Sequence, residues 1–374
     1  MTGSERNGFP SLADKIECLF LSLTGRCQLS CFGCLFNCTD TDLFRRADVG
    51  EKEGSPVSPH SFKQLISEMT EMNISKLKFG YADEPLLHTR IADFAALAYE
   101  SGIDVGITTN GIDLTPSLSE DLIRAGVTSI IVSRGMVQSR SEVRSVDESI
   151  ESVTKAEDGL KNLLVARDKF LKKKKNTTKV FTTIVTEGGL CEVTACDGGL
   201  DEVSHFIRKW EGSCDGIIVN SFLQRSEPLG GIVTRNPRIP LPSRKPCMSP
   251  FKELYLMHDS STFCCVPAVV DCLRDKASRA EKSGHLWNLG SWKDVSLREL
   301  AGNLRRKKLQ RVHQEERYDD VDLCHNCMAW CQHYPKTESK GNVLMEETSF
   351  WSFRRMMEAP DAPKGNDRDF MREC

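Results

Sequence analysis

The sequence lacks any long apolar segment. No run of about 18 apolar residues occurs in it, so we expect no helix that crosses a bilayer. Its opening residues, MTGSERNGFP, are polar and lead into no apolar stretch of the kind found in signal peptides. These absences predict a cytoplasmic protein that has no membrane partner.

The chain also has little net charge, and we find no internal repeat in it. Its 50 basic and 53 acidic residues leave a formal net charge of -3, which gives no general attraction to nucleic acid or to an anionic surface. A length of 374 residues is enough for one large domain and a smaller appendage. We therefore expect no nucleic-acid partner.

Cysteine is absent between Cys38 and Cys191 but abundant on either side. Sixteen cysteines in a chain without a secretory signal indicate metal binding or redox chemistry, because the cytosol keeps thiols reduced. One group lies near the start of the chain and another after residue 246, which predicts two metal sites. Four further cysteines are expected to be buried apolar residues: Cys18, Cys191, Cys196 and Cys214.

Short β-type runs alternate with helical patterns from residue 19 to about residue 225. Most of the runs are rich in Val, Ile, Leu, Phe or Thr, as buried strands are. Six β-then-α units in succession predict an α/β fold with a parallel sheet and right-handed crossovers. Six units are too few for the eight-stranded barrel, so we expect a partial (βα)6 barrel with ligands at the carboxyl ends of its strands. The predicted strands are 19–23, 76–80, 105–109, 129–133, 180–185 and 216–221.

Composition divides the chain into five segments. An N-terminal extension (1–18) precedes the barrel (19–227), and a linker (228–246) with five prolines follows it. A cysteine-bearing domain (247–334) and a polar C-terminal tail (335–374) come last. Within the barrel, the third helix is expected to begin at Ser119 and to end at Gly126, a suitable C-terminal cap.

The first cysteine group directly follows the first predicted strand. Cys27, Cys31 and Cys34 lie on one short loop, and three thiolates at the carboxyl end of a strand are well placed to hold a 4Fe–4S cluster. Three ligands for four irons leave one iron open to a further ligand. With Cys38 as a fourth ligand, the same loop would instead suit a structural zinc ion.

The order of strand, Thr-Gly-Arg and Cys27-x3-Cys31-x2-Cys34 resembles the motif of the radical S-adenosylmethionine (SAM) superfamily. Residues 80–87 (GYADEPLL) are similar to the family's Gly-Gly-Glu-Pro segment, which binds the SAM amino group, although Tyr81-Ala82-Asp83 replaces the glycine pair. Residues 108–111 (TTNG) resemble the family's strand end near the ribose, and Ser133 ends the fourth strand, where a serine often contacts SAM. The resemblance implies a SAM-binding 4Fe–4S cluster and these cofactor-binding residues: Ala82, Asp83, Glu84, Thr109, Asn110 and Ser133.

The second cysteine group combines a single cysteine, a predicted hairpin and a distant Cys-x2-Cys pair. Four thiolates of this kind can enclose one cluster without an open iron. The arrangement is similar to the SPASM and twitch extensions of radical SAM enzymes, which implies one auxiliary 4Fe–4S cluster. Its ligands would be Cys247, Cys264 or Cys265, Cys324 and Cys327. Cys272, Cys331 and Cys374 leave room for a second auxiliary cluster, and a zinc ribbon is the alternative interpretation of such pairs.

The resemblance also implies an activity. Radical SAM enzymes cleave SAM reductively to a 5′-deoxyadenosyl radical that abstracts hydrogen, while the protein orients the cofactor and excludes side reactions. An electron donor such as flavodoxin or ferredoxin is implied as a partner. Only 26 residues precede Cys27, too few for a separate peptide-recognition domain, which favours a small biosynthetic metabolite (amino sugar, nucleoside or amino acid) over a peptide or protein. A non-catalytic zinc-binding interaction protein is the alternative from another class, and no catalytic side chain is assigned.

Overall fold

The protein is described by a computed structural model. It describes residues 15–29, 34, 36, 56–136, 146–171, 178–186, 200–221, 223–225, 232–234, 243–278, 284–340, 343–348 and 351–356. In this part of the chain no helix combines the length and the apolar character needed to cross a bilayer. Of the cysteines expected to be buried, Cys18 is buried and Cys214 is half-buried, while Cys191 and Cys196 lie outside the described residues.

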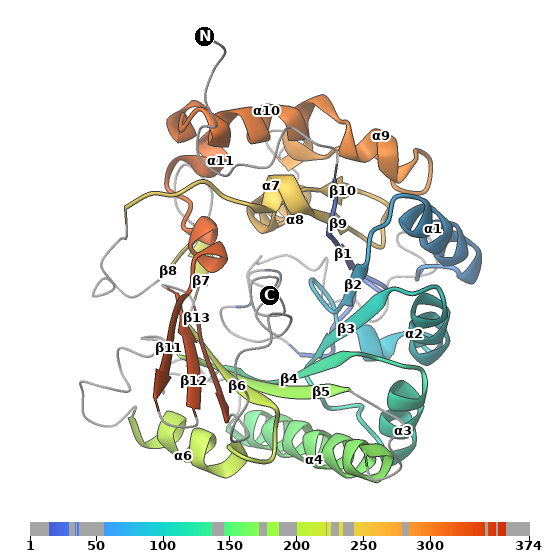
Figure 1. Ribbon diagram of the computed structural model, residues 1–374, viewed down its shortest axis with the longest axis vertical. Coiled ribbons are helices and arrows are strands. Elements are labelled where there is room, and N and C mark those ends of the chain that lie inside the picture. Colours follow the sequence, from blue (N-terminus) through green and yellow to red (C-terminus); the bar gives the residue numbers. More distant parts are fainter. Residues whose placement is uncertain are drawn as a thin grey trace.

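Six parallel strands in sequence order form the centre of a curved sheet (Figure 1), which confirms the predicted β/α alternation. Each pairs in parallel with the next. They are β1 (Cys18–Leu21), β2 (Lys76–Phe79), β3 (Asp104–Thr109), β4 (Ser129–Met136), β5 (Lys179–Thr186) and β6 (Gly216–Ser221).

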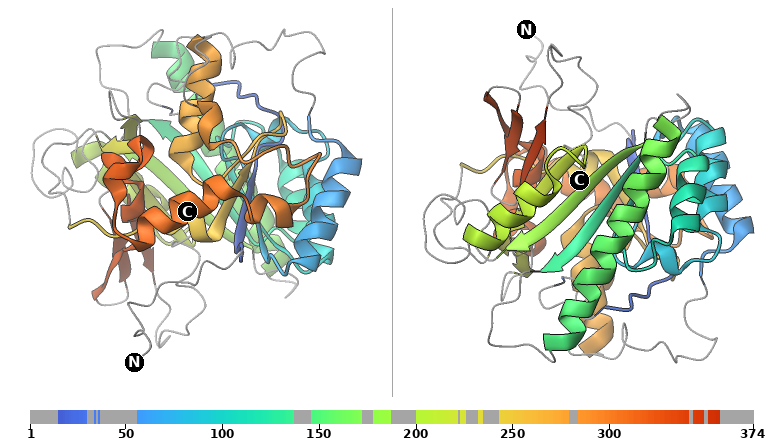
Figure 2. Two further views of the ribbon diagram at one scale, coloured as in Figure 1. Left: turned by 90° about the horizontal axis from the view of Figure 1, so that it is seen from above. Right: turned by 90° about the horizontal axis from the view of Figure 1, so that it is seen from below.

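Helices follow these strands and lie on the outer side of the curved sheet (Figure 2). Two of them begin at a capped proline: the Ser58 side chain accepts from Ser61 N, and the Thr115 side chain accepts from Leu118 N. Because of this second cap, the third helix begins at Pro116 rather than at the expected Ser119. The helices are α1 (Pro59–Glu71), α2 (Ile91–Glu100), α3 (Pro116–Arg124), α4 (Val146–Leu171) and α6 (Leu200–Trp210).

Strands from the second half of the chain extend both edges of this sheet. At one edge, β9 (Glu253–Leu256) pairs in parallel with β1 and is followed outward by β10 (Thr262–Phe263). At the other edge, β13 (Trp351–Met356), β12 (Val343–Glu347) and β11 (Lys336–Lys340) continue from β6 in antiparallel order. The cysteine-bearing segment is therefore built onto the barrel.

Three strands lie within the segment expected to be a polar tail, at residues 336–340, 343–347 and 351–356. Sequence such as Lys336-Thr-Glu-Ser-Lys340 has no apolar face, but its backbone groups pair with β12. The apolar anchor of this meander is Phe353, whose ring lies 5.9 Å from that of Phe181 in an edge-to-face arrangement. Part of the predicted linker also contains a strand, because β7 (Leu223–Arg225) pairs with β8 (Ile232–Thr234).

Further helices connect the remaining segments, and several of them lie above the barrel in Figure 1. Those nearest the second cysteine group are α7 (Ser249–Lys252), α8 (Val266–Ser278), α10 (Leu304–Gln314), α11 (Asp322–His325) and η4 (Ala329–His333). The others are η1 (Pro85–Leu87), η2 (Gly284–Trp287), α9 (Leu297–Ala301) and η3 (Tyr318–Asp320).

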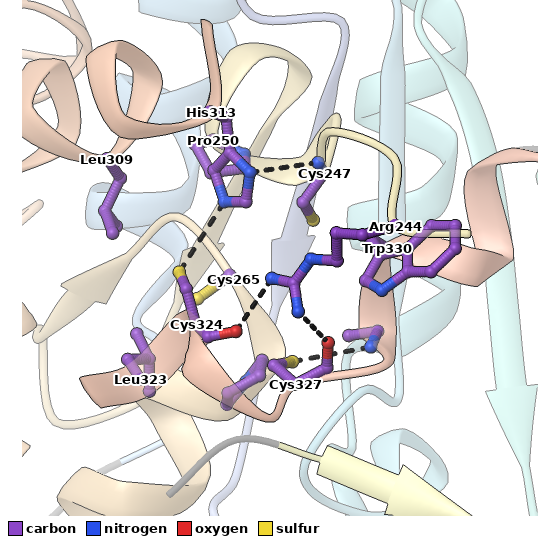
Figure 3. Close-up of a pocket in the computed structure, with 12 residues that line it drawn as sticks. Arg244, Cys247, Pro250, Cys265, Leu309, His313, Leu323, Cys324, Cys327 and Trp330 are labelled. Carbon is purple, nitrogen blue, oxygen red and sulfur yellow. Dashed lines mark hydrogen bonds between the residues drawn. The ribbon is translucent and has the colours of Figure 1, made fainter. Parts of the chain in front are cut away.

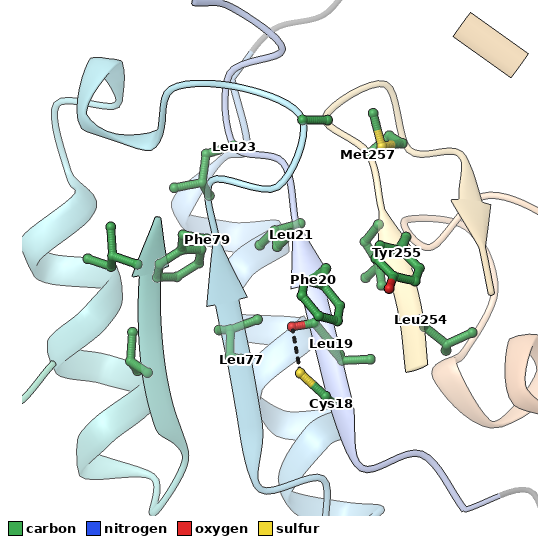
Figure 4. Packing of buried hydrophobic residues seen from close by; sticks show 14 of the residues in the cluster. Cys18, Leu19, Phe20, Leu21, Leu23, Leu77, Phe79, Leu254, Tyr255 and Met257 are labelled. Carbon is green, nitrogen blue, oxygen red and sulfur yellow. Dashed lines mark hydrogen bonds between the residues drawn. The ribbon is translucent and has the colours of Figure 1, made fainter. Parts of the chain in front are cut away.

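The buried apolar residues form two clusters. The larger one includes Leu19, Leu21, Leu77 and Phe79, which alternate along β1 and β2 (Figure 4). The smaller one joins inner-face residues of the sheet to the second cysteine group. Its members are Ile131, Phe181, Ile218, Cys247, Cys327, Met328, Ala329, Trp330, Cys331 and Phe353. Three cysteines of the second group, Cys247, Cys327 and Cys331, therefore pack with inner-face residues of the barrel.

Candidate functional site

The loop after β1 is held in place by Asp83. One carboxylate oxygen, Oδ2, accepts hydrogen bonds from Thr24 N at 2.6 Å, from Thr24 Oγ1 at 3.1 Å and from Gly25 N at 3.0 Å. The other oxygen, Oδ1, is buried and accepts no hydrogen bond among the described residues. Asp83 thus fixes the start of the first cysteine loop and keeps one acceptor for a further donor.

Glu84 joins the same loop to the end of β3. Its backbone N–H donates to Arg26 O at 2.7 Å. Its carboxylate accepts from Thr109 Oγ1 at 2.7 Å, from Asn110 N at 2.7 Å and from Leu86 N at 3.1 Å. Burial raises the pKa of the Glu84 carboxyl to about 7, although these three donors favour the charged form.

The raised pKa of Glu84 should make the folded chain less stable as the pH rises. Between about pH 4.5 and pH 7 the unfolded carboxyl has released its proton while the folded one keeps it, so the free energy of unfolding falls through this window and levels off above it. A pKa shift of this size corresponds to a change of on the order of 3 kcal/mol in the free energy of unfolding. Urea unfolding across this range should show a smaller pH slope for Glu84→Gln than for the parent, and equal slopes would contradict this prediction.

Cys27 lies at the end of this network. Its sulfur accepts from Leu29 N at 3.5 Å and from Asn110 Nδ2 at 3.9 Å. Burial, with smaller contributions from Glu84 and Cys34, raises the pKa of the Cys27 thiol to about 11, so metal binding would have to displace a proton. Cys31 lies outside the described residues.

The structure brings most of the expected SAM-binding residues together. Asp83, Glu84, Thr109 and Asn110 belong to the hydrogen-bonded network around Cys27, and the side chain of Ala82 is buried in the larger apolar cluster. Two strands away from β2, Ser133 is half-buried on β4 beside Thr183 of β5. It shares the inner face with Ile131, since residues two apart point to the same side of a strand.

Gly80 permits the close approach of β2 to β3 at this point. Its φ is +83°, and a Cβ there would lie 1.8 Å from the backbone oxygen of Thr108. Gly102 has a similar φ of +79°, but a Cβ there would have nothing within 4 Å. The two glycines therefore separate the conformational effect of an added methyl group from its steric effect.

We expect Gly80→Ala to be far more destabilising than Gly102→Ala. The second substitution adds only the conformational cost of a positive φ, about 1–2 kcal/mol. The first also forces the Thr108 backbone away from β2 and should weaken binding at the Cys27 network. Urea unfolding of both variants measures the difference, and equal losses would mean that the contact relaxes without cost.

Four members of the second cysteine group line one small cavity (Figure 3). Cys247, Cys265, Cys324 and Cys327 all line it. The adjacent Cys264 is fully buried and does not line the cavity, so Cys265 is the member of this pair that faces it. Burial raises the pKa of the Cys265 and Cys324 thiols well above the ordinary range, and neighbouring thiols add to the effect.

These four cysteines are thiols rather than disulfides. In the described part of the chain, no three His, Cys, Asp or Glu side chains converge on one point as ligands of a single ion would. The sulfur atoms are instead distributed around the cavity (Figure 3), whose remaining wall is largely apolar. Cys272 and Cys331 do not line it and lie in different buried clusters, and Cys374 lies outside the described residues.

Arg244 holds the turn that carries two of these cysteines. Its Nη2 donates to Cys324 O at 2.7 Å, and its Nη1 donates to Cys327 O at 3.0 Å and to His325 O at 3.3 Å. The guanidinium also lies over the Tyr318 ring at 4.5 Å. One side chain from the predicted linker thus fixes the Cys-x2-Cys geometry.

Two histidines contact the cysteines directly. His313 on α10 accepts from Cys247 N through Nδ1 at 3.2 Å, and its Nε2 lies 3.5 Å from Cys324 Sγ. His333 Nε2 lies 3.1 Å from Ser249 Oγ and 3.7 Å from Cys247 Sγ. Burial lowers the pKa of His313 to about 4 and that of His333 to about 3.

Sequence reasoning missed Arg244, both histidines and the clamp that Asp83 forms on Thr24. His313 stands in a run of basic residues (LRRKKLQRVHQ) that reads as an exposed helix, so the sequence carries no signal for its role. The same loop packs closely against His258, because a Cβ at Gly25 would lie 2.0 Å from the His258 ring.

Part of the chain matches a known protein family. Residues 21–188 match the family model described as the Radical SAM superfamily. The chain is 30% identical over 120 residues to a "Probable GTP 3′,8-cyclase" of Methanococcus vannielii. This match covers 32% of this chain and 36% of that protein. It is 24% identical over 137 residues to a "Tungsten-containing aldehyde ferredoxin oxidoreductase cofactor-modifying protein" of Pyrococcus furiosus, covering 36% of this chain and 35% of that protein.

A solved structure shares the fold over most of its length. The structure described as "Native anSMEcpe with bound AdoMet and Cp18Cys peptide" matches with a TM-score of 0.51 and 11% identity, covering 84% of this chain and 90% of that chain. At this identity the match concerns the fold alone. By sequence, the chain spans about two fifths or less of the length of the curated relatives above.

Proposed function

Over residues 21–188 the chain belongs to the Radical SAM superfamily, and from this we propose its function. We propose that it holds a SAM-binding 4Fe–4S cluster on Cys27, Cys31 and Cys34 and uses this cluster in a radical transformation of a small metabolite. When bound, the cluster and SAM supply the electron transfer that yields methionine and a 5′-deoxyadenosyl radical. The observation that carries the proposal is the hydrogen-bonded network joining the Cys27 loop to the carboxyl ends of β2 and β3.

The residues of this network fit the cofactor. Asp83 Oδ1 is a buried acceptor that lacks a donor among the described residues, and it suits the ammonium group of SAM. Asn110 adjoins Cys27 and would lie beside the nucleoside part. Glu84 would act through the backbone it holds, because its carboxylate oxygens already accept three hydrogen bonds. Ser133 would line the SAM pocket from β4.

The second cavity is proposed to hold one auxiliary 4Fe–4S cluster on Cys247, Cys265, Cys324 and Cys327. Four thiols around one largely apolar cavity are the donor set that such a cluster requires. The packing of Cys247 and Cys327 with inner-face residues of β4, β5 and β6 would set this cluster beside the space enclosed by the barrel. A role in holding the substrate or exchanging an electron with it fits that position.

The substrate is proposed to be a small biosynthetic metabolite, such as an amino sugar, nucleoside or amino acid. Neutral polar groups lie on the inner face at the carboxyl ends of the strands, where Asn220 Nδ2 donates to Thr183 Oγ1 at 2.9 Å near Ser133. The resemblance to proteins described as GTP 3′,8-cyclases also favours a small molecule. A peptide substrate is the alternative, and flavodoxin or ferredoxin is the proposed electron donor.

Anaerobically reconstituted protein should be brown and, when reduced, should convert SAM to methionine and 5′-deoxyadenosine. To identify the substrate class, an extract of cells grown in heavy water can be supplied as substrate with and without peptidase treatment. Deuterium in 5′-deoxyadenosine, measured by mass spectrometry, should survive the peptidase if the substrate is a small metabolite. A colourless, zinc-loaded protein without SAM cleavage would contradict the activity, and a peptidase-sensitive signal would contradict the substrate class.

A further inference from the structure

His313 lies between two of the cysteines that line the second cavity. Its side chain is 1% exposed, and it reaches the cavity from α10, on the same side as Leu309 (Figure 3). The backbone N–H of Cys247 points to Nδ1 at 3.2 Å, and the sulfur of Cys324 lies 3.5 Å from Nε2. One ring therefore links the first and third cysteines of the group.

The two contacts together determine which ring nitrogen carries the proton. A backbone N–H can only donate, so Nδ1 of His313 must accept and must have its lone pair available. The proton of the neutral ring then resides on Nε2, which faces Cys324 Sγ. A thiolate at Cys324 would thus receive an N–H···S hydrogen bond whose direction is fixed by the backbone of Cys247.

The other three sulfurs have different surroundings. Cys327 Sγ accepts from the backbone N–H of Ala329 at 3.4 Å, and the Cys265 thiol interacts with the backbone N–H of Ala268. Cys247 Sγ lies 3.7 Å from His333 Nε2, but that nitrogen is closer to Ser249 Oγ at 3.1 Å. Ser249 also forms backbone and side-chain hydrogen bonds to the Cys247 sulfur, whereas His313 is the side chain that contacts Cys324 Sγ and is oriented by a backbone N–H.

We propose that His313 is a positioning residue that donates from Nε2 to the Cys324 sulfur and thereby raises the reduction potential of the auxiliary cluster. The proposal rests on the auxiliary cluster proposed above. A reduced cluster carries one more negative charge than an oxidised one, so a donor to its sulfur ligand stabilises the reduced form more. The apolar side chains of Leu309, Leu323 and Trp330 line the same cavity, which makes the bond stronger than it would be in water.

Two substitutions of His313 separate its two contacts. In His313→Asn the amide oxygen can take the place of Nδ1 and accept from Cys247 N, but no donor reaches Cys324. In His313→Gln the longer side chain can bring an amide N–H to the position of Nε2, but the hydrogen bond from Cys247 N is lost. A purely structural role would make the two variants alike or make the loss of the Cys247 bond the more harmful one.

The test is a redox titration of the SAM-insensitive EPR signal in parent, His313→Asn and His313→Gln proteins. At a fixed ambient potential the Asn variant should show about a tenfold lower ratio of reduced to oxidised cluster, a shift of about 59 mV to more negative potential. The Gln variant should remain near the parent. An Asn variant that keeps its iron with an unchanged potential would overturn the proposal, as would equal shifts in both variants.

A measurement on the natural side chain keeps the proposal testable if either variant loses iron. Isotopically labelled histidine in a His333→Gln background should give a weak nitrogen coupling on the same EPR signal, and its absence would overturn the proposal. The iron content of the parent distinguishes this failure from that of the underlying cluster. About eight irons per chain indicate that the auxiliary cluster is present, and about four indicate that the cluster itself is missing.

Discussion

A variant with Cys27, Cys31 and Cys34 all replaced by alanine is expected to lose SAM cleavage completely and to retain about four irons per chain, against about eight in the parent. The first group lies on the loop after β1, whereas the cavity thiols come from segments after residue 246. Removing the first set therefore leaves the second donor set intact. Iron analysis and 5′-deoxyadenosine production measure the two effects independently.

Added SAM should distinguish the two clusters in a second way. Three protein ligands leave one iron open on the first cluster, so SAM should perturb its EPR spectrum in the parent and have no effect in the triple variant. If the parent holds about four irons and the triple variant none, the cavity thiols bind zinc or no metal, and the auxiliary cluster is excluded. About twelve irons in the parent would indicate a second auxiliary cluster.

Replacing Cys324 and Cys327 together by alanine is expected to stop product formation while leaving some uncoupled SAM cleavage. Two of the four thiols around the cavity disappear in this variant, and the backbone turn held by Arg244 loses the groups it positions. The SAM-insensitive EPR signal should vanish, and the iron content should fall to about four per chain. Retained product formation would show that the cavity has no part in the reaction.

The adjacent pair Cys264 and Cys265 supplies the matched control for this experiment. Cys265→Ala should reduce the iron content because Cys265 lines the cavity, whereas Cys264→Ala should leave it unchanged because Cys264 packs in the core. Both substitutions remove one buried thiol from the same turn, so the difference reports ligation rather than packing. Equal iron loss in both would contradict the choice of Cys265.

Much of the barrel could be predicted from the sequence because its physical signals are local. The buried strands read as short runs rich in branched and aromatic residues, and the motif cysteines follow the first of them directly. The placement of Asp83, Glu84, Thr109 and Asn110 near one loop follows from the rule that parallel strands end at one edge of a sheet. The role of Asp83 as a clamp could not be predicted, since it depends on the exact approach of the β1 loop.

Other features depend on contacts between distant segments, and the sequence carries little trace of them. Lys336-Thr-Glu-Ser-Lys340 becomes a strand only because β12 is beside it, which is a case of tertiary context overriding local preference. The choice between Cys264 and Cys265 depends on which side chain faces the cavity. The basic run around His313 gives no sign of its position, because polar residues of the same helix such as Arg306 and Gln310 are buried as well.

The pairing of β1 with β9 has a consequence for how the chain is made. β1 is an inner strand, with β2 on one side and β9 on the other, and Cys18 lies opposite Glu253 in the second pairing. During synthesis, one edge of β1 keeps unpaired backbone groups until the segment after the predicted linker emerges, and such an edge is prone to aggregate. A fragment ending near residue 227 would expose that edge directly beside the first cysteine loop. The strand that carries the loop is therefore translated before β2 to β6, but both of its edges are paired only after all of them have emerged.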